Sequence, residues 1–355
     1  MHLLFDLAIW WHIPNLDGRS ARNRTCDSHV DTKRSHMKTS ITQLLEIDIP
    51  IVQGGLAHLA FAGLCAAVSN AGGLGQISAV TIPGDVAGLR KEIRAVRTLT
   101  DRPFAVNFAI STRRDIMDLV ETALDEDVRI MSFTAGNPEP FLKRLDGTGV
   151  KTLILVAGVR QAQKVEELGG SAVIAVGYDG GGHLGRDDIG TMVLVPRILE
   201  SVSIPVLASG GIGNGRGLAA ALAMGAGGIE MGTRFVATVE CIAHENYKQA
   251  LVAAREIDTR IIERSLGSPG RVLHGPIGDR IIEREAAGDR DEVIRLISGK
   301  INQRGAIDGV LDEGWVWSGQ VAGLIHDVPT VKELIDRMTR EAAELLRQAS
   351  AAFSG

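Results

Sequence analysis

The chain has 355 residues, a length that suits one large domain or two smaller ones. Hydrophobic residues make up 45% of it and charged residues 23%, and the formal net charge of -5 argues against a basic surface for nucleic acid. No apolar run is long enough to cross a bilayer, and the three cysteines share no metal-ligand spacing, so we expect a cytoplasmic protein without a bound metal.

The first 36 residues combine an apolar start with a polar stretch that has no periodicity. The start has no basic region and no small-residue cleavage site, so a signal peptide is not expected. Regular patterning begins at Met37. We therefore expect residues 1–36 to be an extension, either a disordered tail or a segment foreign to the folded protein.

From residue 49 onward, short β-branched runs alternate eight times with helical segments. The runs are nearly continuous in hydrophobic residues, which is typical of strands buried on both faces of a parallel sheet. Eight such units predict an α/β fold, a (β/α)8 TIM barrel over residues 37–235, whereas an open doubly wound sheet rarely needs as many. The predicted strands are IPIVQGG, LGQISA, FAVNFAI, RIMSFTAG, TLILVAG, AVIAVGY, PVLASGG and GIEMGTRF.

The pattern changes after the eighth predicted strand. Residues 236–305 have helical patterns around an irregular middle, RSLGSPGRVLHGPIGDR, and we expect a helical lid or subdomain beside the barrel mouth. Residues 306–355 end in an amphipathic helix, VKELIDRMTREAAELLRQA, which we expect to pack back on the barrel.

The carboxyl ends of the predicted strands are rich in glycine and small polar residues. Active sites of such barrels form at this face, and small side chains let a flat ligand lie close to the backbone. The candidate ligand-binding residues at these ends are Gly54, Gln76, Asn107, Asp179, Gly210, Gly211, Gly232 and Thr233.

Two glycine motifs follow the seventh and eighth predicted strands. Gly210 and Gly211 lie in ASGGIGNGRG, just before a helix, and Gly232 and Thr233 lie in MGTRF. Barrels often bind a phosphate between these two loops, where free backbone N–H groups face the anion. The glycines could serve only tight turns, but the two loops together favour a phosphate site.

The loop after the sixth predicted strand, VGYDGGGHLGRDDIG, brings a histidine to the barrel mouth on a run of glycines. Glycines such as Gly182 can adopt positive φ and approach a ligand closely. This placement favours a role for His183 in proton transfer over a structural one. Asp179 could accept a hydrogen bond from a ligand hydroxyl or hold a backbone turn. We expect Asp187 and Asp188 to cap the next helix.

These motifs together resemble the nitronate monooxygenase family, formerly called 2-nitropropane dioxygenases. The likeness runs from about residue 49 to residue 344 and includes QGGLAHLAFAGLCAAVSNAGGLGQISA, GYDGGGHLGRDDIG, SGGIGNGRGLAAALAMGA, MGTRF and WSGQVAGLIHDVPT. The resemblance implies FMN on a TIM barrel, with its phosphate on the loops at 210–211 and 232–233. It also implies that His183 is the catalytic histidine.

The sequence departs from the family pattern at two places. Family members commonly have Glu-(Ala or Cys)-(Gly or Ala)-Gly-His in the histidine loop, whereas this chain has Asp179 followed by three glycines. Some relatives carry a lysine at the end of the fifth strand, where this chain has Leu155 or Val156. Both differences weaken the assignment to one subfamily.

The resemblance implies oxidation of alkyl nitronates or nitroalkanes by O2 to a carbonyl compound and nitrite. NAD(P)H:quinone reduction and enoyl-thioester (enoyl-ACP) reduction use the same barrel and stay open as alternatives. NAD(P)H would then stack transiently on the flavin, because no separate dinucleotide-binding unit is present. A flavin-free aldolase or epimerase is less expected, since no strand end offers a lysine. We expect Trp315 and Trp317 to serve core or lid packing.

Overall fold

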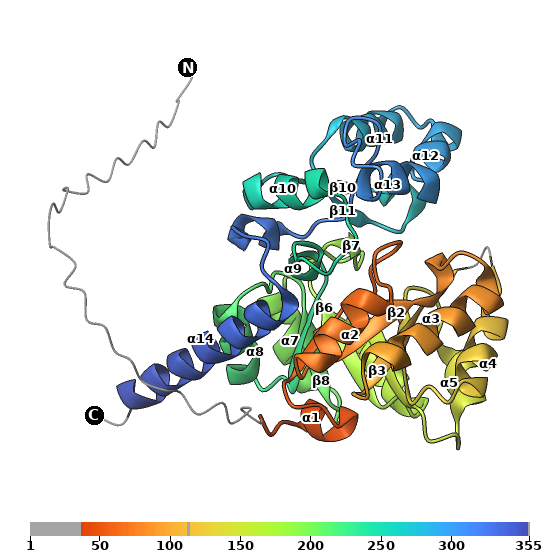
Figure 1. Ribbon diagram of the computed structural model, residues 1–355. Coiled ribbons are helices and arrows are strands. Elements are labelled where there is room, and N and C mark those ends of the chain that lie inside the picture. Colours follow the sequence, from red (N-terminus) through yellow and green to blue (C-terminus); the bar gives the residue numbers. More distant parts are fainter. Residues whose placement is uncertain (1–36, 112–113, 354–355) are drawn as a thin grey trace, which may run out of the picture. The chain divides into compact units, whose positions relative to one another are not determined.

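The computed structural model describes residues 37–111 and 114–353, so the prediction for residues 1–36 lies outside the described residues (Figure 1). Eight parallel strands form one sheet in the order β1-β9-β8-β6-β5-β4-β3-β2. The sheet closes between its two ends, because the Leu74 N–H donates to the Ile51 carbonyl at 2.9 Å. The predicted TIM-like barrel is confirmed.

The barrel strands coincide with the hydrophobic runs of the sequence. They are β1 (Ile51–Gln53), β2 (Gly75–Ser78), β3 (Phe104–Ala109), β4 (Ile130–Thr134), β5 (Lys151–Val156), β6 (Ala172–Val176), β8 (Val206–Ser209) and β9 (Gly228–Met231). Alternate residues face the inside of the barrel, because side chains along a strand alternate between its two faces.

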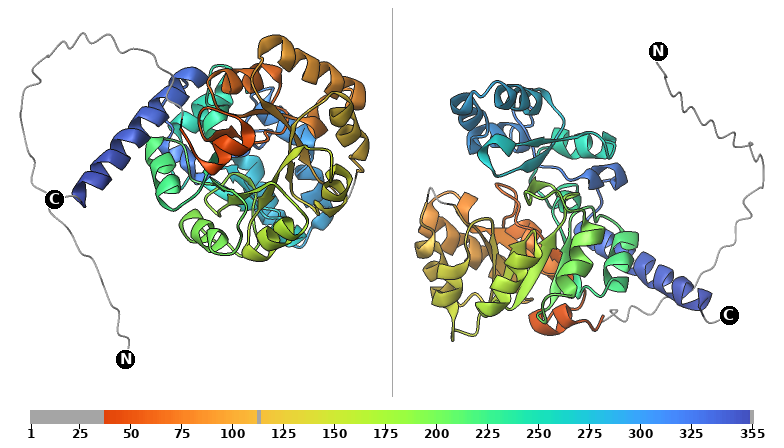
Figure 2. Two further views of the ribbon diagram at one scale, coloured as in Figure 1. Left: turned by 90° about the horizontal axis from the view of Figure 1, so that it is seen from below. Right: turned by 180° about the vertical axis from the view of Figure 1, so that it is seen from behind.

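The inside of the barrel has its own small apolar core. It includes Val52, Leu153, Ile174 and Leu207 from the strands, together with Ile41 and Leu45 of helix α1 (Ser40–Leu45). Figures 1 and 2 show α1 at the amino ends of the strands, where it closes the barrel from below. With that end filled, a ligand can approach the strands only from their carboxyl ends.

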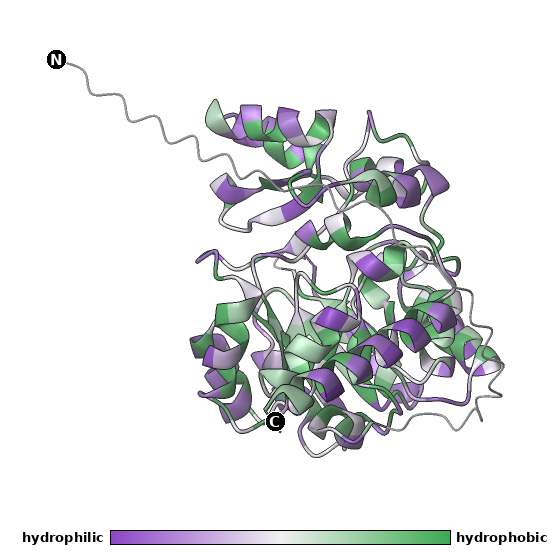
Figure 3. Ribbon diagram, turned by 90° about the vertical axis from the view of Figure 1, so that its left-hand side faces the viewer, coloured by the Kyte–Doolittle hydropathy of each residue, from purple (hydrophilic) through white to green (hydrophobic). Residues whose placement is uncertain are grey.

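The outward faces of the strands pack against a ring of helices, which Figure 2 shows from below. Hydrophobic residues gather on the strands and the inner sides of these helices, and hydrophilic residues on the outer sides (Figure 3). The helices are α2 (Ala62–Asn70), α3 (Asp85–Leu99), α4 (Met117–Asp125), α5 (Glu139–Leu145), α6 (Val159–Glu167), α7 (Thr191–Leu199) and α8 (Gly215–Ala223).

A cap follows the barrel and lies over the carboxyl ends of its strands (Figure 1). It contains α10 (Glu245–Ala253), β10 (Thr259–Ile262), β11 (Gly270–Leu273), α11 (Pro276–Ala286), α12 (Arg290–Leu296) and α13 (Gly299–Ala306). Its core comprises Ile262, Val272, Ile281, Val293, Leu296 and Trp315. The expectation of a helical segment over residues 236–305 is therefore wrong in one respect, because β10 and β11 form an antiparallel hairpin.

The cap sheet has a third strand that comes from the barrel. The two-residue strand β7 (Gly182–His183) lies in the histidine loop and pairs with β11, with His183 opposite Gly270. The cap and the histidine loop thus share one small sheet.

The chain returns to the barrel after the cap. A 3-10 turn, η3 (Gln320–Leu324), leads to α14 (Val331–Ala352), which packs mainly against α8 and also against α2. Thr330 and Glu333 form a capping box that starts this helix. Within the described residues, no helix is both long and apolar enough to cross a membrane.

Candidate active site

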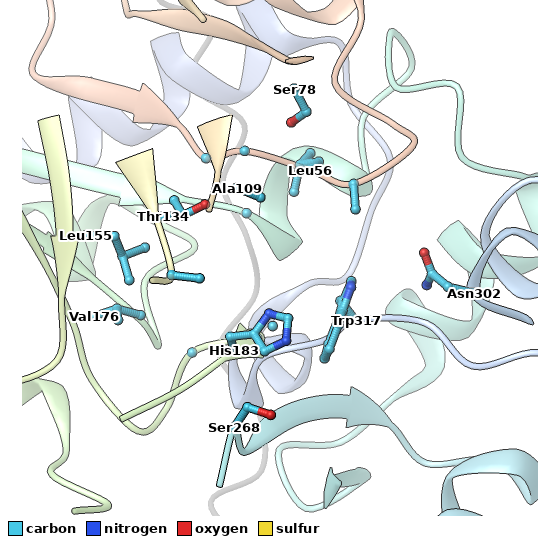
Figure 4. Close-up of a pocket in the computed structure, with 18 of the residues that line it drawn as sticks. Leu56, Ser78, Ala109, Thr134, Leu155, Val176, His183, Ser268, Asn302 and Trp317 are labelled. Carbon is cyan, nitrogen blue, oxygen red and sulfur yellow. The ribbon is translucent and has the colours of Figure 1, made fainter. Parts of the chain in front are cut away.

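A cavity of about 930 Å³ lies between the carboxyl ends of the barrel strands and the cap. Of the residues proposed from the sequence, eight line it: Gly54, Asn107, Gly182, His183, Gly210, Gly211, Gly232 and Thr233. Figure 4 shows His183 and Trp317 across from Leu155, Ala109 and Thr134 of the strands. Gln76 and Asp179 lie outside the cavity lining.

Gln76 is completely buried beneath the cavity floor. Its side-chain oxygen accepts a hydrogen bond of 2.5 Å from the Ser132 hydroxyl, which in turn accepts one of 2.9 Å from the Asn107 amide. The Gln76 amide donates to the Gln53 carbonyl. Gln76 thus supports Asn107, which borders the cavity, rather than reaching the cavity itself.

Asp179 holds a turn. One of its carboxylate oxygens accepts a hydrogen bond of 2.8 Å from the Thr191 N–H at the start of α7. The predicted capping of α7 by Asp187 and Asp188 is wrong, because Asp179 takes that position and Asp188 pairs with Arg264 at 3.0 Å. Asp179 also lies beneath Gly211, where a Cβ would come within 3.1 Å of the Asp179 Cβ.

The two glycine loops have the geometry of an anion cradle. Gly210 and Gly211 have φ of 94° and 72°, and a Cβ on Gly210 would lie 2.9 Å from the Gly177 carbonyl oxygen. In the described part of the chain, no acceptor engages the backbone N–H of Gly211 or Thr233. The Thr233 hydroxyl accepts from the Gly319 N–H at 3.0 Å, so its own proton remains available to a ligand.

His183 faces the cavity from β7. Its side chain is 54% exposed and faces this cavity. Its ring centre lies 5.1 Å from that of Trp317, and its Nε2 lies 4.0 Å from a carboxylate oxygen of Glu263. Burial by the surrounding protein lowers the pKa of His183 below its ordinary value of 6.5, so the imidazole is neutral at pH 7.

The cap contributes residues that the sequence did not single out for the site. Glu263 is buried and has a φ of 66°, unusual for a residue other than glycine. Trp317 lines the cavity, and the Tyr247 hydroxyl donates to its carbonyl. Trp315 packs in the cap core, as expected, and donates to the Leu296 carbonyl at 2.9 Å.

Glu230, on the barrel side of the cavity, is a further residue that was not predicted from the sequence. It lies on β9, lines the cavity and accepts a hydrogen bond of 2.8 Å from the Ser209 hydroxyl. Burial raises the pKa of Glu230 to about 7. The sequence could have indicated Glu230 as a site residue, because an acidic residue stands inside the predicted strand GIEMGTRF and a charge is costly to bury in a barrel.

The cavity has an unsatisfied donor that a polar ligand would satisfy. The Ser78 hydroxyl borders the cavity, is buried, and has no hydrogen-bond partner among the described residues. An unpaired buried hydroxyl costs about 1–3 kcal/mol. Together with the glycine cradle, this donor fits a flat ligand that carries a phosphate at one end and polar edges at the other.

A TIM barrel with an anion cradle after its last two strands is typical of enzymes that bind a phosphorylated ligand. The family model for nitronate monooxygenase matches residues 38–119 and 110–341, and the chain belongs to that family. It is therefore an oxidoreductase, and the family resemblance stated from the sequence is confirmed.

Three known proteins illustrate the range of its similarities. FabK from Thermotoga maritima is 40% identical, with a TM-score of 0.84 over 89% of this chain and 99% of that one. A nitroalkane oxidase from Streptomyces ansochromogenes is 28% identical, with a TM-score of 0.75 over 88% and 99%. A (3aS,4S,5R,7aS)-5-hydroxy-7a-methyl-1-oxo-octahydro-1H-indene-4-carboxyl-CoA dehydrogenase from Rhodococcus jostii is 31% identical over 87% of this chain and 96% of its own length.

Proposed function

We propose that the protein binds FMN and oxidises nitroalkanes or alkyl nitronates with O2 to a carbonyl compound and nitrite. The observation that carries this proposal is that His183 faces the same cavity as the two glycine loops, with burial lowering its pKa. The similarity to a nitroalkane oxidase supports it.

The residues that would hold FMN come from both sides of the floor. Gly210, Gly211, Gly232 and Thr233 would bind the phosphate through backbone N–H groups and one hydroxyl. Bound FMN supplies a two-electron acceptor that O2 can reoxidise. Asn107 and Ser78 offer polar groups at the opposite side of the floor.

His183 would remove the α-proton of a neutral nitroalkane. A base must be unprotonated before the reaction, and the lowered pKa of His183 keeps it so at neutral pH. The Glu263 carboxyl at 4.0 Å is well placed to stabilise the imidazolium that results. A preformed nitronate needs no proton removal, and His183 would then serve as a hydrogen-bond donor to the anionic substrate.

The same neutral histidine bears on the choice between the candidate reactions. Reduction of an enoyl thioester requires a proton donor at carbon, and burial disfavours the protonated form of His183. Oxidation requires a proton acceptor, which the neutral form provides. The lowered pKa of His183 therefore favours the oxidative direction.

A thioester substrate is the second candidate, and two arginines favour it. Arg186 and Arg290 line the cavity from the histidine loop and from α12, and neither has a carboxylate within salt-bridge distance among the described residues. Arg186 donates to the Gly267 carbonyl at 2.7 Å, but the charge of its guanidinium has no carboxylate partner among the described residues. Guanidinium groups without a carboxylate partner suit the phosphates of a coenzyme A thioester. The carboxyl-CoA dehydrogenase relative agrees with this candidate.

Anaerobic mixing tests both candidates. The FMN-loaded protein is mixed separately with propyl nitronate, with NADH, and with NADPH, and the flavin absorbance is followed. Bleaching by the nitronate, and restoration of the colour with release of nitrite when O2 is admitted, would support the proposal. Bleaching only by NADH or NADPH would transfer the assignment to a quinone or thioester reductase.

A further inference from the structure

Glu230 is a buried acid for which the proposed reaction has no use. Only 6% of the residue is exposed, and one carboxylate oxygen accepts from the Ser209 hydroxyl at 2.8 Å. Its other oxygen lies against the tip of β1, where a Cβ on Gly54 would come within 3.2 Å. Among the described residues, no lysine, arginine or histidine forms a salt bridge with it.

This carboxyl lines the same cavity as the two loops of the phosphate cradle. Glu230 is paired with Ser209 in the register of β8 and β9, and the next residue after Ser209 is Gly210. Gly232 follows Glu230 two residues later. An ionised carboxylate would therefore share the cavity with an incoming phosphate dianion, without a salt-bridge partner among the described residues to offset its charge, and the two negative charges would repel each other.

We propose that FMN binding requires Glu230 to carry its proton, so that the cofactor enters together with one proton at this carboxyl. The proposal rests on FMN as the cofactor. In its neutral form the carboxyl becomes a hydrogen-bond donor toward the cofactor, in place of a repelling charge. Burial, opposed by the hydrogen bond from Ser209, raises the pKa of Glu230 to about 7, so the proton is present under mildly acidic conditions and lost under alkaline ones.

The groups around the Glu230 carboxyl bear on whether its own ionisation controls FMN binding. The two residues that contact the carboxyl, Gly54 after β1 and Ser209 of β8, are uncharged. Arg234, after Thr233, directs its guanidinium to Asp327 instead. The other titratable or charged groups that line the cavity or its loops are His58, His183, Tyr247, Glu263, Asp179, Arg186 and Arg290.

The test measures the dissociation constant of FMN for the full chain, freed of flavin, from about pH 5.5 to about pH 9 by quenching of flavin fluorescence. For the unaltered protein, the constant should rise toward tenfold per pH unit above about pH 7, as expected when one proton must be bound. The Glu230→Gln variant should bind FMN with a constant that stays flat over the alkaline range.

Two further measurements separate this effect from others. The second ionisation of the FMN phosphate, near pH 6, affects the unaltered protein and Glu230→Gln alike, so it cancels in their comparison. Ser209→Ala removes a hydrogen bond that favours the ionised carboxylate of Glu230. The pH above which FMN binding begins to weaken should therefore be higher in this variant. If a variant fails to fold, calorimetry of the unaltered protein in buffers of different ionisation enthalpy still counts the protons taken up with FMN, and we expect a value approaching one at alkaline pH.

A dissociation constant that does not change above pH 7, or a rise that Glu230→Gln retains, would overturn the proton coupling and leave the proposed function standing. Calorimetry that finds no proton uptake would do the same. An absence of FMN binding at every pH would overturn the cofactor assignment as well, and with it the proposed function.

Discussion

Replacement of His183 by asparagine tests the proposed base directly. The histidine ring extends into the cavity, and its backbone pairing with Gly270 does not depend on the side chain. Asparagine keeps a hydrogen-bond donor but cannot accept a proton at neutral pH. We therefore expect the variant to fold, to bind FMN as before, and to lose mainly the step that requires a base.

The expected loss depends on the substrate. General-base catalysis contributes about 10²- to 10⁴-fold, so kcat/KM for nitroethane should fall by this factor, whereas that for ethyl nitronate should fall distinctly less. For the unaltered protein, kcat/KM for nitroethane should decline as the pH falls through the pKa of His183, which burial places below 6.5. The variant should lack this decline. Nitrite release under air measures both substrates.

His58→Asn is a matched control. His58 also lines the cavity with a pKa lowered by burial, but it lies on the β1–α2 loop and its Nδ1 meets the Gln303 amide at 2.9 Å. Its φ of 63° suits asparagine. This variant should keep the rate with nitroethane within a few-fold.

If His183→Asn lowered kcat/KM equally for nitroethane and for ethyl nitronate, His183 would position the substrate instead of acting as a base. No loss on either, with NADH-dependent quinone reduction intact, would refute the reasoning altogether.

Three further predictions concern the cradle and the floor. Gly211→Glu should abolish flavin retention in gel filtration, because its carboxylate would occupy the phosphate position and the left-handed backbone adds about 1–2 kcal/mol of strain. The unaltered apoprotein should lose stability as the pH rises from 4.5 to 7, because the raised pKa of Glu230 stabilises the folded state only while its proton is bound. Glu230→Gln lacks this loss, so its free energy of unfolding in urea, relative to that of the unaltered protein, should increase over this range by on the order of 3 kcal/mol. Ser132→Ala leaves the Asn107 amide unpaired and should cost about 1–3 kcal/mol by the same measurement, together with weaker FMN binding.

Hydrophobic pattern alone was enough to predict the barrel. Most strand residues are buried on both faces of the sheet, so the sequence shows nearly continuous apolar runs. Strand direction then places every carboxyl end at one mouth. That rule brought Gly54, Asn107, His183 and the two glycine loops to the same cavity.

The same rule could not tell which residues at a strand end reach the ligand. Gln76 and Asn107 both point toward the barrel axis. Gln76, however, lies below the cavity floor, where its side-chain oxygen accepts from the Ser132 hydroxyl, which in turn accepts from the Asn107 amide. Asp179 follows strand β6 closely, but its carboxylate accepts a hydrogen bond from the Thr191 N–H at the start of α7, twelve residues later. Such competition between partners depends on the folded arrangement and leaves no local pattern.

The cap hairpin escaped prediction for a related reason. Strands β10 and β11 have four residues each and carry Arg260 and Arg271, so neither shows a strong apolar run. Their third partner, β7, comes from a loop more than seventy residues earlier. Pairing over that distance is set by where the barrel holds the loop.

If His183 is the base proposed above, the shared sheet couples the position of the cap to the position of that base. Because β7 pairs with β11, and the Leu184 N–H donates to the Pro269 carbonyl at 2.8 Å, a cap that swings away from the barrel pulls on the segment that carries His183. An opened protein would therefore admit substrate with its base withdrawn, and the base would return only as the cap closes and shuts out bulk water. Proton abstraction would then be confined to the sealed state, in which a reactive carbanion has the fewest alternative fates.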